Sequence, residues 1–150
     1  MRSTYRVLAY AIPVLVAVQA AAIALGVFGL THWIEDGNDV TKSVVDNNSS
    51  RITGSAGFGI HAIDGTMIIP LVALVLLIVS FFAKIPGGTK WALFVLGDVI
   101  LQILLAYTAF GVPVVGMLHG VNALILAGLG ITAAARINRV TTEAQPEMAA

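Results

Sequence analysis

Apolar side chains fill four long runs of this sequence, which are separated by shorter segments rich in turn-forming or polar residues. An α-helix rises 1.5 Å per residue, so about 20 apolar residues are needed to cross the hydrocarbon core of a bilayer. The runs are close to that length and lie at about residues 7–30, 60–83, 91–110 and 117–135. The pattern predicts an all-α, integral membrane, up-and-down four-helix bundle at residues 1–140. It also predicts an outer loop at 31–59 and a flexible tail at 141–150.

Composition agrees with this assignment to the membrane. The chain has 150 residues, of which 58% are hydrophobic and 11% are charged. Soluble domains carry about 25% charged residues, so the lipid bilayer is the expected surrounding. The formal net charge is zero, and no basic excess indicates nucleic acid as a partner. Cysteine is absent, which excludes disulfides, cysteine-ligated iron–sulfur clusters and haem attached through thioether bonds.

Basic residues predict the orientation of the four helices. Six of the eight Lys and Arg residues flank the ends that would share one membrane face: Arg2, Arg6, Lys84, Lys90, Arg136 and Arg139. The other two lie in the 31–59 loop, where acidic residues outnumber them. Basic residues concentrate on the cytoplasmic side of membrane proteins. We therefore expect a multi-pass bacterial protein of the plasma (inner) membrane with both termini in the cytoplasm.

Two histidines begin the second and fourth apolar runs in matching sequence contexts. The sequence reads His-x-x-Asp-Gly from His61 and His-x-x-Asn-Ala from His119. A titratable side chain inside a membrane span is costly and is a functional-site hypothesis by default. With the predicted orientation, both imidazoles lie towards the outer leaflet, on helices that are diagonal neighbours in an up-and-down bundle. The pair is therefore a candidate bis-histidine site for haem, with both residues as metal ligands.

The heights of the two histidines along their helices can be compared. His61 lies 23 residues before Lys84, and His119 lies 17 residues before Arg136. At 1.5 Å per residue these separations are about 34 and 26 Å. A tilt of about 20° is usual for membrane helices, and Pro70 could kink the second span. These adjustments permit a shared site.

Residues close to the histidines complete the candidate site. Asp64 and Asn122 lie one helical turn beyond them, on the same helix face. Gly65 and Gly120 are small enough to leave room for a flat macrocycle. Arg51, in the outer loop, could pair with a haem propionate. The alternative interpretation is that these are polar residues at the membrane–water boundary, and it remains open.

Other polar residues of the spans and the outer loop also carry hypotheses. Gln19 and Gln102 lie 12 or 13 residues beyond the nearest cytoplasmic basic residue, each on the outgoing helix of a hairpin, which indicates a duplicated unit. We expect them to face the core and form interhelical hydrogen bonds, or to line a cofactor pocket. Asp98 is either a proton relay or a protonated carboxyl bonded to a backbone carbonyl or to Gln102. His32 is an alternative ligand in the outer loop.

The layout of four spans, with the stretch Leu-His-Gly-Val-Asn-Ala-Leu at 118–124, resembles one half of the haem A synthase architecture. It is also similar, more loosely, to membrane b-type cytochromes and to a bacterial family of small four-span membrane proteins. The resemblance implies haem b bound between histidines on helix pairs. Two features differ from the synthase pattern. No Glu-x-x-His-Arg string surrounds His61, and the chain has one candidate histidine pair rather than two.

The first functional expectation is a small b-type haem-binding protein, acting as an electron carrier or a haem-binding subunit. One haem near the outer leaflet cannot carry electrons across the bilayer alone, so a quinone or another redox subunit is the expected partner. One alternative is a non-catalytic accessory subunit of a larger membrane complex. Another is a proton- or ion-coupled transport element using Asp98 and Asp64, for which four spans would require a homo-oligomer. No nucleophile–base pair, phosphate loop or dinucleotide fingerprint indicates an enzyme.

Overall fold

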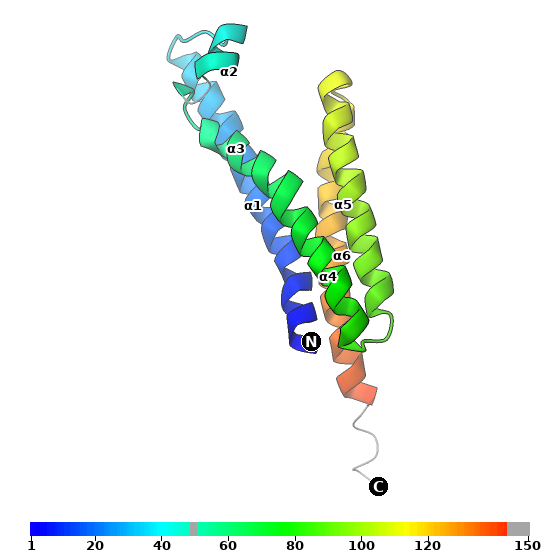
Figure 1. The fold of residues 1–150 in the computed structure, drawn as a ribbon. Helices are drawn as coiled ribbons and strands as arrows, with labels where there is room; N and C mark the ends of the chain where they lie inside the picture. Colours follow the sequence, from blue (N-terminus) through cyan, green and yellow to red (C-terminus); the bar gives the residue numbers. More distant parts are fainter. Residues whose placement is uncertain (49–50, 144–150) are drawn as a thin grey trace. The chain divides into compact units, whose positions relative to one another are not determined.

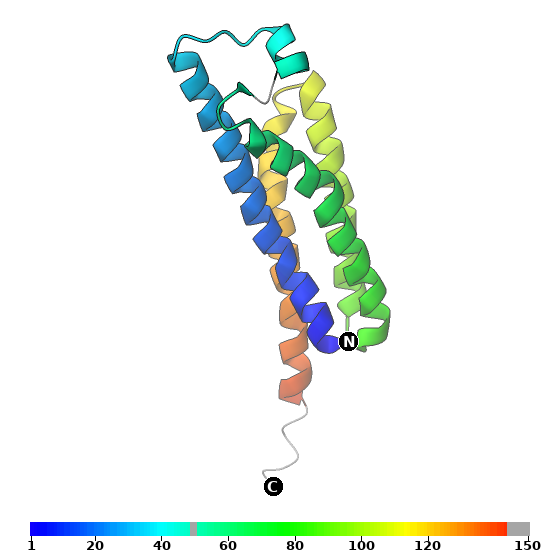
Figure 2. The same cartoon turned by 60° about the vertical axis from the view of Figure 1, so that its left-hand side comes forward.

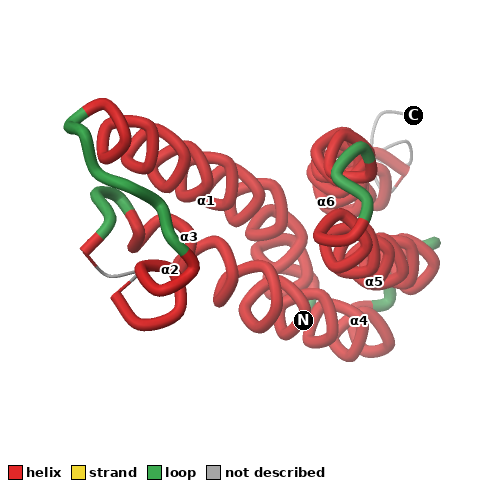
Figure 3. The backbone as a smooth tube through the Cα atoms, turned by 90° about the horizontal axis from the view of Figure 1, so that it is seen from above, coloured by secondary structure: helices red, strands yellow, loops and turns green. Residues whose placement is uncertain are grey.

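The computed structural model describes residues 1–48 and 51–143, and the described part contains helices and short loops but no strand (Figures 1 and 3). The elements in chain order are α1 (Arg2–Glu35), α2 (Lys42–Asn48), α3 (Ser55–Ile63), the π-helix η2 (Asp64–Ile68), α4 (Ile69–Ala83), α5 (Gly88–Gly111) and α6 (Val115–Glu143). The predicted all-α class is therefore confirmed.

Four helical stretches are long and apolar enough to cross a membrane: Arg2–Glu35, Ser55–Ala83, Gly88–Gly111 and Val115–Ile137. Each contains one predicted span and extends beyond it, because polar and charged residues at the helix ends continue the backbone hydrogen bonding. The predicted 31–59 loop is also partly helical, since it includes α2 and the adjoining ends of α1 and α3. Of the predicted 141–150 tail, residues 141–143 belong to α6 and the remainder lies outside the described residues.

The chain forms two compact units. The first combines Met1–Val16 with Met67–Ala150, and the second is Ala17–Thr66. α1 and η2 each contribute residues to both units. Each of the two histidines with its neighbouring helix falls inside one unit, so the surroundings of each can be described separately.

The first unit packs the first half of α1 with α4, α5 and α6 around one apolar core. Its fully buried large side chains are Tyr5, Ile12, Leu76, Val95, Val99 and Leu126. α5 and α6 run antiparallel and side by side, joined by a short turn at 112–114 (Figures 1 and 2). Small residues bring the helices close, because a Cβ on Gly130 would lie 2.8 Å from Cδ of Pro13 and 2.9 Å from the carbonyl oxygen of Ala9. This packing fixes the register of the α5–α6 hairpin.

The second unit is held by direct contact between the backbones of α1 and α3. Gly26 and Gly29 on α1 lie against Gly54 and Gly57 at the start of α3. A Cβ on Gly57 would overlap the carbonyl oxygen of Ala22, and a Cβ on Gly29 would overlap that of Thr53. Helices approach this closely only where small residues line the interface. The glycines therefore determine how α3 lies on α1.

A π-helical segment follows directly after α3. It spans Asp64–Ile68 and leads into α4, whose second residue is Pro70. Proline has no N–H to donate, and π-helical turns are a common way for a helix to absorb such an interruption. The irregularity predicted at Pro70 thus occurs one turn earlier, next to His61. Asp64 is 6% exposed as a result of its place in this segment.

The glycine contact of the second unit yields a matched test within α3. We expect Gly57→Ala to lower the free energy of unfolding by about 1–3 kcal/mol, because the added methyl group overlaps the backbone of α1. Gly59→Ala should leave it unchanged or raise it slightly, because a Cβ there meets nothing within 4 Å. Unfolding of the full chain by dodecyl sulfate in mixed micelles, followed by circular dichroism, measures both. Equal stabilities of the two variants would contradict the close approach of α1 and α3.

Candidate functional site

The first histidine is held by a glutamine of the facing helix in the second unit. The amide nitrogen Nε2 of Gln19 on α1 donates to the backbone carbonyl of His61 at 2.9 Å and to Oδ2 of Asp64 at 3.0 Å. In return, the imidazole Nδ1 of His61 lies 3.2 Å from the backbone carbonyl oxygen of Gln19. Side chain and backbone of the two residues therefore bond reciprocally. We call Gln19, His61 and Asp64 the first clasp.

The second histidine has the same arrangement inside the first unit. Nε2 of Gln102 on α5 donates to the backbone carbonyl of His119 at 3.0 Å, and Nδ1 of His119 lies 3.1 Å from the backbone carbonyl oxygen of Gln102. Nε2 of Gln102 also lies 3.4 Å from Nε2 of His119. Asn122 donates to Oε1 of Gln102 at 2.8 Å, and its amide nitrogen lies 3.4 Å from Oδ2 of Asp98. We call these four residues the second clasp.

The shared geometry fixes the chemistry of both imidazoles. A carbonyl oxygen can only accept, so each Nδ1 carries the hydrogen and donates it to the backbone of the facing helix. In a neutral imidazole Nε2 is then the nitrogen with the lone pair. Histidines that ligate a metal or haem iron commonly have their second ring nitrogen bonded in this way, to a carbonyl or a carboxylate. Both clasps thus orient a histidine whose Nε2 is the basic nitrogen.

The clasps differ in the residue that follows the histidine by one turn. Asp64 is an acceptor and takes a hydrogen from the Gln19 amide, whereas Asn122 is a donor to the Gln102 amide oxygen. Each is 6% exposed. The sequence analysis considered both as candidates to orient the imidazole, but their recorded partners are the glutamines. They therefore position the histidines indirectly, by fixing the glutamine side chain.

The remaining predicted site residues lie in different surroundings. A Cβ on Gly65 would lie 3.3 Å from the amide nitrogen and oxygen of Gln19, whereas one on Gly120 would meet nothing within 4 Å. Gly65 therefore makes room for the glutamine of the first clasp. His32, at the end of α1, is exposed and lies 3.6 Å from Asp36. Arg51 lines a shallow surface hollow of the second unit together with Trp33, Asn38, Asp39, Thr41 and Val44.

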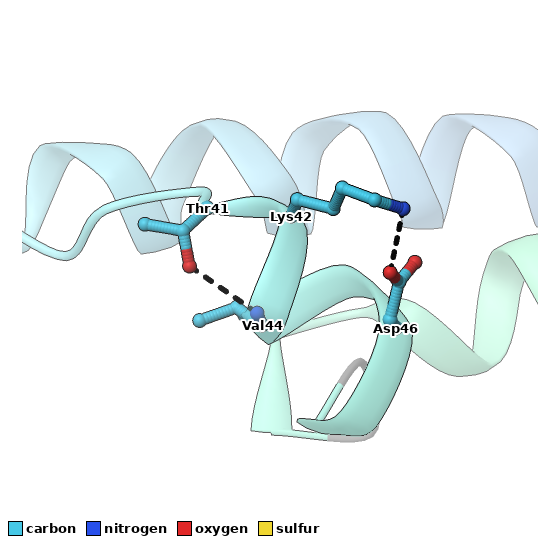
Figure 4. Close-up of polar contacts among 4 residues, drawn as sticks. All are labelled: Thr41, Lys42, Val44 and Asp46. Carbon is cyan, nitrogen blue, oxygen red and sulfur yellow. Dashed lines mark hydrogen bonds and ion pairs between the residues drawn. The ribbon is translucent and has the colours of Figure 1, made fainter.

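The outer segment between α1 and α3 has its own polar contacts. Nζ of Lys42 lies 2.7 Å from Oδ2 of Asp46 one turn along α2, and the hydroxyl of Thr41 accepts from the backbone N–H of Val44 at the start of that helix (Figure 4). The ion pair is exposed to solvent, where such pairs contribute little to stability. These contacts order α2 locally and involve neither clasp.

The residues described by the structure include no group of three or more His, Cys, Asp and Glu side chains placed to hold a metal ion. A site built from acidic and histidine ligands of one unit is thus not found among them. Within each clasp, the basic nitrogen of one imidazole is the group suited to bind a metal centre.

The glutamines are the functional neighbours that sequence reasoning identified without their partners. Their equal distance from the cytoplasmic basic residues indicated a duplicated unit with interhelical bonds, and such bonds are confirmed. That each glutamine bonds the histidine of its own hairpin follows from the register between the helices, which hydropathy does not reveal. Asp98 likewise contacts Asn122 on α6 rather than bonding Gln102 directly.

No protein-family model matches this sequence, and no curated protein and no solved structure is significantly similar to it. The proposals below therefore rest on the contacts of the described residues.

The Asp/Asn difference between the clasps predicts an asymmetric response to exchanging these residues. Asp64→Asn keeps an acceptor for the Gln19 amide, so we expect little change in the free energy of unfolding. Asn122→Asp removes the donor to Gln102 and places a second carboxyl beside Asp98, so we expect a loss of about 1–3 kcal/mol. The same dodecyl sulfate titration measures both variants. An equal effect of the two exchanges would contradict the assigned hydrogen-bond directions.

Proposed function

We propose that this chain is a small haem-binding membrane protein of the b type, in which His61 and His119 supply the two axial imidazoles. The supporting observation is that both histidines, in separate hairpins, direct Nδ1 to a backbone carbonyl of the facing helix. This anchoring makes Nε2 the ligand nitrogen and limits rotation of the ring before any ligand arrives.

The donor set fits a b-type haem. Two neutral imidazoles suit iron in a porphyrin, and the chain has no cysteine through which haem could be attached covalently. The 3.4 Å separation between the amide nitrogen of Gln102 and Nε2 of His119 exceeds the usual hydrogen-bond range. Ligation by His119 would replace this contact, while the bond from Gln102 to the His119 carbonyl can remain. The bound haem would supply one-electron chemistry.

The predicted orientation gives this proposal a place in the cell. Basic residues at one end of the helices favour the plasma (inner) membrane with both termini in the cytoplasm, and both clasps then lie nearer the outer leaflet. A single haem there would act as an electron carrier or as a haem-binding subunit of a larger complex. Exchange of electrons with the other side requires a quinone or a second redox subunit. Arg51 and Gly120 remain candidates for contact with the propionates and the macrocycle.

Absorption spectra test the proposal. The full chain, expressed with excess haem and purified in detergent, should show a Soret band and, after reduction with dithionite, sharp α and β bands. His61→Ala and His119→Ala should each abolish the low-spin spectrum, because either change removes one axial nitrogen. His32→Ala is the matched control and should retain it, since His32 is an exposed residue paired with Asp36. Circular dichroism establishes that every variant is still helical.

A flat spectrum of the unaltered protein would contradict haem binding. Loss of the bands in His32→Ala with their retention in His61→Ala would contradict the assigned ligands. Either result would favour the alternative in which the clasps only join helices of an accessory subunit, with effects of His61→Ala confined to assembly.

A second candidate function is proton- or ion-coupled transport. The observation that favours it is the chain of contacts from Asp98 through Asn122 and Gln102 to His119, which connects two titratable groups inside the first unit. Asp64 is buried at the corresponding place of the first clasp. Proton flux into liposomes that falls in Asp98→Asn would support this function, and unaltered flux would remove its basis.

A further inference from the structure

Five basic side chains gather at one end of the first unit. They are Arg2 and Arg6 of α1, Lys84 after α4, Lys90 of α5 and Arg136 of α6, and we call them the basic collar. Contacts between the helices place them together. Arg2 reaches the backbone carbonyls of Ala83 and Lys84 at 3.4 and 3.5 Å, and the hydroxyl of Tyr5 donates to the carbonyl of Gly88 at 2.9 Å.

Aromatic rings orient three of these cations. The guanidinium of Arg136 lies 4.8 Å from the centre of the Trp91 ring, and the ammonium of Lys90 lies 5.6 Å from that of Phe94. The two rings meet edge to face, with their centres 5.6 Å apart. On α1, Arg6 lies 5.9 Å from the ring of Tyr10. Such contacts hold a cation in position, but they leave its full charge in place.

No carboxylate within the described side chains balances the collar. The ion pairs found there, His32 with Asp36 and Lys42 with Asp46, both belong to the second unit. Asp98 is the one acidic residue among the described side chains of the first unit, and its recorded partner is Asn122. Carbonyl oxygens and rings therefore surround five positive charges, and the balancing negative charge has to come from outside the described structure.

We propose that the basic collar binds the phosphate groups of acidic phospholipids. The helices that carry it are long and apolar enough to span a bilayer, so the collar at their ends falls at the level of the headgroups. Acidic lipids attract basic residues at this level by about 1 kcal/mol each. Trp91 and Tyr10 are residues that prefer the same interface.

Apolar side chains beside the collar favour a lipid over a soluble anion. Phe81 and Phe82 precede Lys84 by two and three residues and are 64% and 63% exposed, and Phe94 below Lys90 is 46% exposed. A phospholipid would place its acyl chains against these rings while its phosphate meets the cations. A free phosphate ion would use only the charges. This proposal is independent of haem binding.

Spin-labelled lipids measure the predicted preference. The full chain is reconstituted in phosphatidylcholine bilayers, and electron paramagnetic resonance compares the association of labelled phosphatidylglycerol with that of labelled phosphatidylcholine. We expect phosphatidylglycerol to associate more strongly, and the preference to fall about two- to fivefold in Lys90→Gln and in Lys84→Gln. Lys42→Gln removes the same charge from the second unit and should leave the preference unchanged, because Lys42 is paired with Asp46.

Two results would overturn the proposal. One is an equal association of both lipids with the unaltered protein, or an equal effect of Lys42→Gln and Lys90→Gln. The other is competition by inorganic phosphate beyond that of chloride at the same ionic strength, since this would identify a site for free phosphate. Because the measurement needs no haem, its outcome is distinct from that of the absorption spectra.

Discussion

Polar groups inside the hydrocarbon of a bilayer have no water to bond, so each must find a partner within the protein. This constraint explains most of the polar contacts in the four spanning helices. Hydroxyl groups bond their own helix, as Thr108 does with the carbonyl of Leu104 and Thr132 with that of Gly128. Amides and imidazoles are too large to be satisfied in this way and bond the next helix. Among the described residues no buried side-chain nitrogen or oxygen lacks a partner.

The two clasps answer this constraint with one design. In each, a glutamine side chain bonds the histidine backbone, and the histidine ring bonds the glutamine backbone. A backbone carbonyl in a helix can accept a second hydrogen bond without giving up the first, so neither helix has to unwind. Because the imidazole uses Nδ1, the basic nitrogen is Nε2 in both hairpins. This is the physical basis on which the proposed haem ligation rests.

The positions of the spans could be predicted because hydropathy over about 20 residues is a strong signal. The ends could not, since residues 31–35 are polar and yet continue α1. The 7-residue α2 is too short and too polar to show a pattern. Pro70 indicated an irregular second span, but the π-helix before it depends on the backbone geometry.

The candidate site was predictable as a set of residues and not as a set of contacts. The repeated His-x-x-Asp/Asn pattern and the equal placement of Gln19 and Gln102 identified all six principal members of the clasps. Which side chain bonds which depends on the register of α1 with α3 and of α5 with α6. Glycine contacts and core packing set that register. Hydrophobic pattern alone does not contain it.

The tautomer of the two histidines is the most direct test of this account. Solid-state NMR of the ¹⁵N-histidine-labelled full chain, without haem, in lipid bilayers and mildly alkaline buffer, distinguishes protonated from unprotonated ring nitrogens. The variants His32→Ala, His61→Ala and His119→Ala assign the signals. For both His61 and His119 the account predicts a protonated, hydrogen-bonded Nδ1 and an unprotonated Nε2. A hydrogen on Nε2 of either residue would contradict it.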